Sequence, residues 1–207
     1  MTTPLFPVFL KLKGRRSLVV GGGTIAAQKL TGLIEAGADV TIVAPKLSAE
    51  VFRLVDSGQT QWIAREFEPG DLDGALLVVA ATGDPEVNER VFLAALARGI
   101  LCNAVDEPER CDFYYPAVVR RGDLQIAIST NGKSPALAQR LRAELESHFD
   151  ATYGEWLAWL GSVRALFFRT PIEPEKRRRA LHQVASRAVF ERFRESRQRK
   201  SEGARHG

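Results

Sequence analysis

The stretch LVVGGGTIAAQKL, residues 18–30, constrains the fold more than any other part of this 207-residue chain. Arg16–Val20 is a short apolar run that leads into a glycine cluster. Thr24–Ala36 then places apolar side chains at helical spacing, and Gly37 ends the pattern. This order predicts a strand, a tight turn and a helix, which together begin a unit of helices packed against a parallel sheet.

The turn fits the pattern G-x-G-x-x-G/A through Gly21, Gly23 and Ala26. Glycines in such a turn let a pyrophosphate approach the backbone amides at the helix start, where a side chain would block it. A tight turn without any ligand is the alternative. We expect a dinucleotide to contact the turn and the first helical residues, which are Gly21, Gly22, Gly23, Thr24 and Ile25.

The end of the second predicted strand lacks the acidic residue that usually binds the ribose of a dinucleotide. Val40–Val43 is followed instead by Ala44, Pro45 and Lys46. Backbone groups or other side chains would then hold the ribose, and the lysine is compatible with a 2′-phosphate. We include these three residues in the predicted cofactor site, and the residues alone leave NAD and NADP open.

Strands and helices alternate over about the first 110 residues, which predicts a parallel sheet covered by helices. The further expected elements are strands at Gln61–Ile63, Ala75–Ala81 and Ile100–Val105, and helices at Ser48–Asp56 and Pro85–Arg98. Beyond Pro116 the pattern changes to a β-hairpin, Ala117–Arg120 and Leu124–Ser129, and then to helices over Pro135–Phe149, Tyr153–Phe168 and Pro174–Arg199. The fold class is therefore α/β, with a Rossmann-type domain at 1–113, a small α+β domain at 114–150 and a helical domain with a basic tail at 151–207.

Polar residues follow the fourth and fifth strands, at the sheet edge where open α/β sheets bind ligands. Thr82, Asn103 and Val105 are expected to line the cofactor site there. Asp106 would place a carboxylate near the reacting carbon and is the predicted catalytic residue. An aspartate in an ordinary turn before Glu107 is the alternative, and periodicity alone leaves both open.

The sequence Thr130-Asn131-Gly132-Lys133-Ser134 ends in GKS, but Ala127 stands where a phosphate-binding P-loop requires glycine. Ser134 is better explained as the cap of the next helix, so that amides and hydroxyls face an anionic group. Thr130, Lys133 and Ser134 are the predicted substrate-binding residues.

Composition and charge exclude several classes of protein. Two cysteines and three histidines match no metal-ligand spacing, so neither a metal site nor a disulfide framework is expected. No window approaches 18 apolar residues, and the N-terminus lacks a basic leader, which predicts a cytoplasmic protein without membrane contact. Residues 176–207 carry eleven Lys or Arg and three Glu, a net charge of +8, which fits either a solvated helix or attraction to a polyanion.

Motifs spread over much of the chain resemble one enzyme family. These are VVGGG with Ala26 and Lys29, AGA before VTIVAP, Gly70-Asp71-Leu72, Ala80-Ala81-Thr82 with Asn88, NAVDEPERCDF, Pro116, and STNGKSP before LAQRLRAELE. In this order and spacing, from about Pro4 to Glu146, they resemble precorrin-2 dehydrogenase, the N-terminal module of siroheme synthase.

The resemblance implies NAD as cofactor and oxidation of precorrin-2, a tetrapyrrole, to sirohydrochlorin in siroheme biosynthesis. In some members of the family, ferrous ion is then inserted as a second substrate, a sirohydrochlorin ferrochelatase activity that no residue here decides. The resemblance also implies a homodimer, with residues 114–150 as the dimerisation domain.

Two other functions are compatible with the residues. A non-catalytic Rossmann protein could sense NAD(H) and act through its basic helical tail. Nucleic-acid binding by the tail is not favoured, because the basic face lacks interleaved aromatic residues and any known reading motif. The sequence does not decide whether the product serves siroheme, cobalamin or haem.

Overall fold

The computed structural model describes residues 4–203 and divides into two compact units between Tyr115 and Pro116. Each unit is described by itself. The three domains predicted at 1–113, 114–150 and 151–207 stay a prediction.

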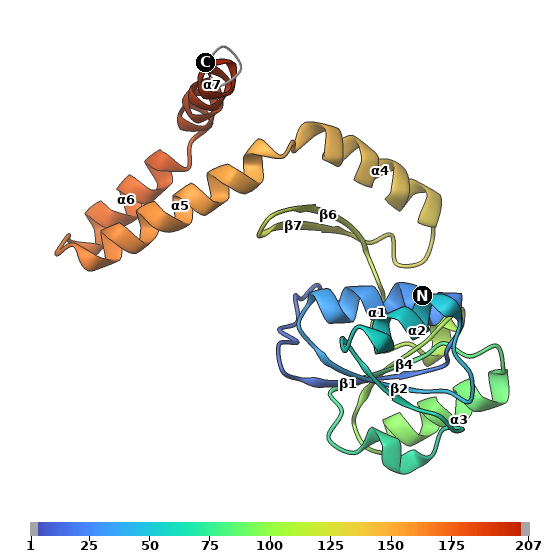
Figure 1. Ribbon diagram of the computed structural model, residues 1–207. Helices are drawn as coiled ribbons and strands as arrows, with labels where there is room; N and C mark the ends of the chain where they lie inside the picture. Colours follow the sequence, from blue (N-terminus) through green and yellow to red (C-terminus); the bar gives the residue numbers. More distant parts are fainter. Residues whose placement is uncertain (1–3, 204–207) are drawn as a thin grey trace. The chain divides into compact units, whose positions relative to one another are not determined.

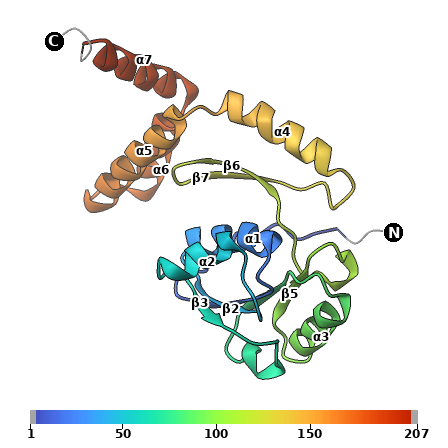
Figure 2. The ribbon, with the colours of Figure 1, turned by 45° about the vertical axis from the view of Figure 1, so that its right-hand side comes forward.

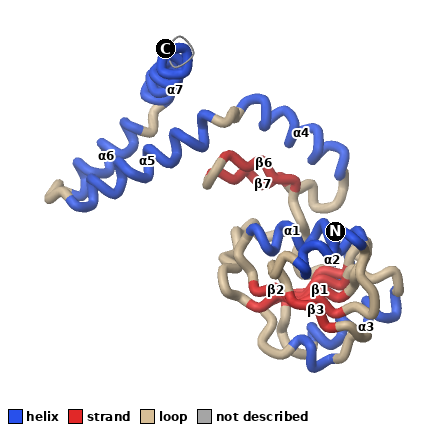
Figure 3. The backbone as a smooth tube through the Cα atoms, in the orientation of Figure 1, coloured by secondary structure: helices blue, strands red, loops and turns tan. Residues whose placement is uncertain are grey.

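The first unit is a parallel five-stranded sheet in the order β3-β2-β1-β4-β5. Its strands are β1 (Arg16–Val20), β2 (Asp39–Val43), β3 (Gln61–Ile63), β4 (Leu77–Ala80) and β5 (Leu101–Ala104). Three helices cover it, α1 (Thr24–Glu35), α2 (Ala49–Asp56) and α3 (Pro85–Leu96). Figure 1 and Figure 3 show α1 and α2 on one face of the sheet and α3 on the other. The predicted Rossmann-type α/β fold is confirmed.

Two apolar cores result, one on each face of the sheet. The core under α1 and α2 contains Val19 and Leu30, and the core under α3 contains Leu18 and Val91. All four residues of β4 are buried, because this strand is covered on both faces, as its continuous apolar run predicts. The chain order reverses between β1 and β4, so their carboxyl ends form the topological switch point at which sheets of this type bind ligands.

A short 3-10 turn, η1 (Pro69–Leu72), is held by one buried carboxylate. Asp71 accepts hydrogen bonds from both terminal nitrogens of Arg65, at 2.6 and 2.9 Å, and from the backbone N–H of Glu68 at 2.8 Å. Burial alone would raise the pKa of Asp71, but these hydrogen bonds outweigh it and hold the pKa below its ordinary value. A second 3-10 turn, η2 (Pro108–Arg110), follows β5.

The second unit begins with an antiparallel hairpin of β6 (Ala117–Arg121) and β7 (Leu124–Ile128), which confirms the predicted hairpin. Its helices are α4 (Pro135–His148), α5 (Thr152–Arg169), α6 (Pro174–Val184) and α7 (Arg187–Gly203). Figure 2 shows α4 running along the hairpin. α5 approaches the hairpin turn so closely that a Cβ on Gly154 would lie 2.8 Å from the carbonyl oxygen of Arg121.

The single helix predicted over Pro174–Arg199 is wrong. The structure ends α6 at Val184 and starts α7 at Arg187, although no Pro or Gly marks the break. The change of direction buries Phe190 to 4% exposure, with its ring centroid 4.2 Å from that of Tyr153. Burial of a large aromatic side chain outweighs the few backbone hydrogen bonds that a continuous helix would add.

Candidate functional site

The glycine turn between β1 and α1 brings two backbones into contact. Gly21 has φ +119°, and a Cβ there would lie 2.3 Å from the carbonyl oxygen of Ala81. A Cβ on Gly22 would lie 2.1 Å from the carbonyl oxygen of Lys46. Any side chain at either position would therefore displace the backbone that follows β2 or β4, so the turn requires both glycines.

The start of α1 is open to a ligand. Gly23 is the N-cap, no side chain caps the helix, and its first turn holds no acidic residue. In contrast, Ser48 caps α2 and Asp84 caps α3 through their side chains. A Cβ on Gly23 would meet nothing within 4 Å. The start of α1 therefore offers free amide donors and open space without a repelling acidic side chain. These are the properties of a site that binds the diphosphate of a dinucleotide.

Of the other residues predicted at this turn, Thr24 and Ile25 form the first turn of α1, and the Ile25 side chain is 45% exposed. Ala44 is buried, and its carbonyl oxygen accepts a hydrogen bond from the Trp62 indole at 2.9 Å. Pro45 and Lys46 are exposed beside the glycine turn. The structure thus places all the residues predicted around the turn at one edge of the sheet.

The loops after β4 and β5 are joined by Asn88, a buried residue of α3 that the predicted site omits. Its side-chain oxygen accepts from the Thr82 hydroxyl at 2.7 Å, and its amide nitrogen donates to Glu107 at 3.1 Å. Glu107 also pairs with Arg110, which reaches Glu89 at 3.2 Å. The only sequence signal was the presence of Asn88 among the family motifs, because helical periodicity gives no reason to single it out.

Asp106 lies in the turn that closes β5, directly before Glu107. Its φ is +63°, in the left-handed region that non-glycine residues seldom adopt, at a cost of about 1 kcal/mol or more. The side chain is exposed and has no hydrogen-bond partner among the described residues. The neighbouring Glu107 instead makes the structural contacts, which leaves the Asp106 carboxylate available to a ligand.

Asn103 and Val105 are used within the chain itself. The Asn103 amide nitrogen donates to the carbonyl oxygen of Phe113 at 2.7 Å and to the sulfur of Cys111 at 3.4 Å. The Val105 N–H donates to the carbonyl oxygen of Ala80 at 2.9 Å. These bonds fix the segment after β5 against the sheet edge, and contact of either residue with a cofactor stays a prediction.

The two cysteines remain thiols at ordinary pH. Burial raises the pKa of Cys102 to about 12 and also raises the pKa of Cys111. The Cys111 thiol donates to the carbonyl oxygen of Ala104 at 3.1 Å. Over residues 4–203, no group of three or more His, Cys, Asp or Glu is placed to hold a metal ion.

Lys29, on α1, was not predicted in the site. Its ammonium nitrogen lies 4.1 Å from the centroid of the Tyr115 ring. Burial lowers the pKa of Lys29, whereas the negative charge of Asp106 acts in the opposite direction. The side chain is therefore directed toward the segment that contains the predicted catalytic residue.

The predicted substrate residues belong to the second unit. The Thr130 hydroxyl donates to the carbonyl oxygen of Ser134 at 3.1 Å and accepts from the Ser134 N–H at 3.2 Å. The Ser134 hydroxyl accepts from the Leu137 N–H at 3.2 Å, so Ser134 is the N-cap of α4, as predicted. The Lys133 side chain is exposed.

Comparisons with known proteins agree with this arrangement. A family described as putative NAD(P)-binding matches residues 8–117, and one described as "sirohaem biosynthesis protein central" matches residues 121–148. The solved structure of SirC, precorrin-2 dehydrogenase, superposes with a TM-score of 0.77 at 31% identity, over 94% of this chain and 100% of that one. The chain belongs to the precorrin-2 dehydrogenase family.

Relatives of this precorrin-2 dehydrogenase family member include longer proteins. The siroheme synthase of Methylobacillus flagellatus is 46% identical over 158 residues, which cover 76% of this chain and 34% of the relative. The siroheme synthase of Mannheimia succiniciproducens is 47% identical over 142 residues, 69% of this chain and 30% of the relative. The chain thus spans about a third of the length of these curated relatives.

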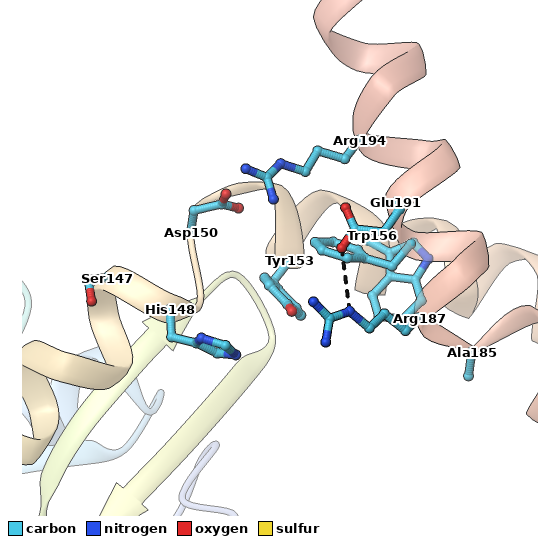
Figure 4. Close-up of a pocket in the computed structure, with 10 residues that line it drawn as sticks. Ser147, His148, Asp150, Tyr153, Trp156, Ala185, Arg187, Glu191 and Arg194 are labelled. Atoms are coloured by element: carbon cyan, nitrogen blue, oxygen red, sulfur yellow. Dashed lines mark ion pairs between the residues drawn. The ribbon is translucent and has the colours of Figure 1, made fainter.

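This member of the precorrin-2 dehydrogenase family also has a pocket of about 470 Å³ in its second unit, between the end of α4, α5 and α7. Figure 4 shows Tyr153 and Trp156 beside an ion pair of Arg187 and Glu191. None of the predicted site residues lines it. No helix in the described part of the chain is long and apolar enough to cross a membrane.

Proposed function

We propose that the chain oxidises precorrin-2 to sirohydrochlorin with NAD as the hydride acceptor. The observation that carries the proposal lies at the carboxyl edge of the parallel sheet. There the uncapped, glycine-lined start of α1 follows β1, and the exposed carboxylate of Asp106 follows β5, on the other side of β4. The full-length likeness to a precorrin-2 dehydrogenase structure supports the same reaction. Siroheme biosynthesis is the pathway suggested by the names of the curated relatives.

The cofactor would lie across the carboxyl ends of the strands. The backbone amides of Gly23, Thr24 and Ile25 would hold the diphosphate, and the segment from Ala44 to Lys46 would border the ribose. The bound dinucleotide supplies an acceptor for a hydride. No acidic side chain stands in the proposed ribose segment, so the 2′-phosphate of NADP would not be repelled there. The preference for NAD over NADP is therefore a separate and more specific part of the proposal.

Dehydrogenation removes a hydride and a proton from the tetrapyrrole. The hydride leaves with both bonding electrons, and the Asp106 carboxylate accepts the proton, so charge and atoms balance. The network of Asn88, Glu107 and Arg110 would hold the Asp106 turn in place during this step. Thr130, Lys133 and the capped helix start at Ser134 are proposed to bind carboxylates of the substrate.

The protein is proposed to act as a homodimer through residues 114–150. The hairpin and helices of the second unit bury few apolar side chains by themselves, which supports a second copy as the missing cover. Insertion of ferrous ion into sirohydrochlorin is a further activity to be tested on the same protein, with the ion as substrate.

An anaerobic assay of precorrin-2 with NAD and with NADP tests the proposal. Asp106→Ala should retain NAD binding, because its exposed side chain makes no hydrogen bond or ion pair with the described residues of the glycine turn, and should lower turnover about 100-fold or more. Spectral conversion to sirohydrochlorin and the NAD dissociation constant are the measurements. Steady-state oxidation by Asp106→Ala at the wild-type rate would remove the assigned role.

The same assay separates the enzyme from a nucleotide sensor. A sensor would bind NAD(H) and leave the spectrum of precorrin-2 unchanged. Addition of ferrous or cobaltous ion to the product then shows whether chelation occurs.

A further inference from the structure

Lys29 carries a half-buried charge without a direct partner of opposite charge. Within the described residues it makes no ion pair within 4.0 Å and no hydrogen bond, and its ammonium group lies over the face of the Tyr115 ring. Other partly buried cations of the first unit have polar partners, and Arg16 donates to the backbone carbonyl oxygens of Asp71 and Asp73. Arg65 holds Asp71, and Arg110 holds Glu89 and Glu107.

Such a position is unfavourable for an ammonium group in the free protein. Burial lowers the pKa of Lys29, which means that the environment disfavours the charged form, and the negative charge of Asp106 only partly opposes this. Tyr115 compensates in part through its ring face, over which the ammonium group lies. Half-buried charges without partners are typical of sites that receive a charged ligand.

The position of Lys29 also indicates which ligand it would bind. Side chains of an α-helix lean toward its N-terminus, so Lys29 leans from α1 toward the carboxyl edge of the sheet. There it faces Asp106, Cys111 and Tyr115, which are the titratable groups recorded around it. The helix start already offers backbone amides to phosphate, whereas the molecule that must reach Asp106 is the compound to be oxidised.

We propose that Lys29 binds a carboxylate of the tetrapyrrole substrate, with the Tyr115 ring as the platform that holds its ammonium group. This inference rests on the proposed function and adds a substrate-binding residue in the first unit. The substrate is a polycarboxylate, and Lys29 would neutralise one carboxylate beside Asp106. Without that cation, the two negative charges would repel each other as the ring approaches.

The test uses the full chain with three lysine variants. Lys29→Met removes the charge, Lys29→Arg keeps it, and Lys11→Met is the matched control, because Lys11 is an exposed lysine of the same unit. Sirohydrochlorin is titrated against each protein by absorbance, NAD binding is measured separately, and kcat and KM are obtained with precorrin-2. We expect Lys29→Met to weaken sirohydrochlorin binding and raise KM by about tenfold, with a smaller change in kcat and less than a twofold change in NAD affinity.

The two other lysine variants are expected to separate charge from structure. Lys29→Arg should recover most of the affinity, and Lys11→Met should behave as the wild type. Lys29→Met should melt at the wild-type temperature or above it, because it removes an unpaired half-buried charge. Lys29→Gln provides the same readouts if the methionine variant does not fold. Tyr115→Leu should weaken tetrapyrrole binding more than Tyr115→Phe, which keeps the ring face.

Two results would overturn the inference while leaving the proposed function intact. One is wild-type tetrapyrrole affinity in Lys29→Met. The other is a loss of NAD affinity without loss of tetrapyrrole affinity, which would assign the ammonium to a phosphate of the cofactor. Failure of the wild-type protein to bind or oxidise the tetrapyrrole would instead refute the proposed function.

Discussion

The two units of this protein differ sharply in how much apolar surface they bury. The first unit has two cores, one on each face of its sheet, in which twelve side chains each are buried. In the second unit, the buried apolar side chains among the described residues are Val119, Ala138 and Phe190. Yet α5 of that unit presents Trp159, Leu166 and Phe168 at 37%, 65% and 52% exposure.

This difference follows from architecture. A parallel sheet with helices on both faces encloses its apolar residues within one chain. A two-stranded hairpin with helices beside it offers one layer, which seldom suffices alone. We infer that the first unit carries its own stability, whereas the second unit requires further cover, which the proposed homodimer would supply.

The test with the largest expected effect makes the same leucine-to-alanine truncation in each unit. Leu18→Ala in β1, where the side chain is 0% exposed, should lower the free energy of unfolding by about 3 kcal/mol. Leu157→Ala in α5, where the side chain is half-buried, should cost about 1 kcal/mol in dilute protein. Hydrogen exchange resolved by peptide assigns each loss to its unit. Equal losses in dilute protein would contradict the contrast between the units.

Dilution provides a test of intermediate size. If a second copy covers the second unit, tenfold dilution should reduce the stability of that unit by about 1.4 kcal/mol, because association is linked to folding. The first unit should hardly respond. Light scattering gives the mass over the same range of concentrations. A monomer at every concentration, with unchanged exchange in the hairpin, would show that the cover is not another copy.

The sequence predicted the features that depend on local residue patterns and missed one that depends on packing between distant segments. Periodicity and glycine spacing gave the parallel sheet, the glycine turn and the cap at Ser134, because those features depend on local residue patterns. The break between α6 and α7 was missed, since it arises from packing of Phe190 against Tyr153, far away in the chain.

The site residues divide in the same way. Asp106 could be singled out by its place after a strand. The hydrogen bonds of Asn88 and the proposed role of Lys29 depend on contacts with Glu107 and Tyr115, which no local pattern encodes.

The smallest predicted effect on stability concerns the ion pair of Asp71 and Arg65. The ion pairs of the second unit are solvent-exposed, with at least about a third of each side chain accessible, whereas Asp71 in the first unit is 5% exposed beneath Arg65. Asp71→Asn should lower the free energy of unfolding at pH 7 by about 1 kcal/mol, a value kept small because Arg65 is 40% exposed.

The pH dependence of this effect follows from the direction of the shift. The pKa of Asp71 is held below its ordinary value of 3.8, so its contribution is fully present above that pH and is lost as the pH falls further. The difference in urea unfolding between the wild type and Asp71→Asn should therefore be present at pH 7 and shrink as the pH falls below 3.8 and through the lowered pKa of the folded state. A difference that persists under strongly acidic conditions would mean that Asp71 stabilises the first unit through packing and hydrogen-bond geometry rather than through its charge.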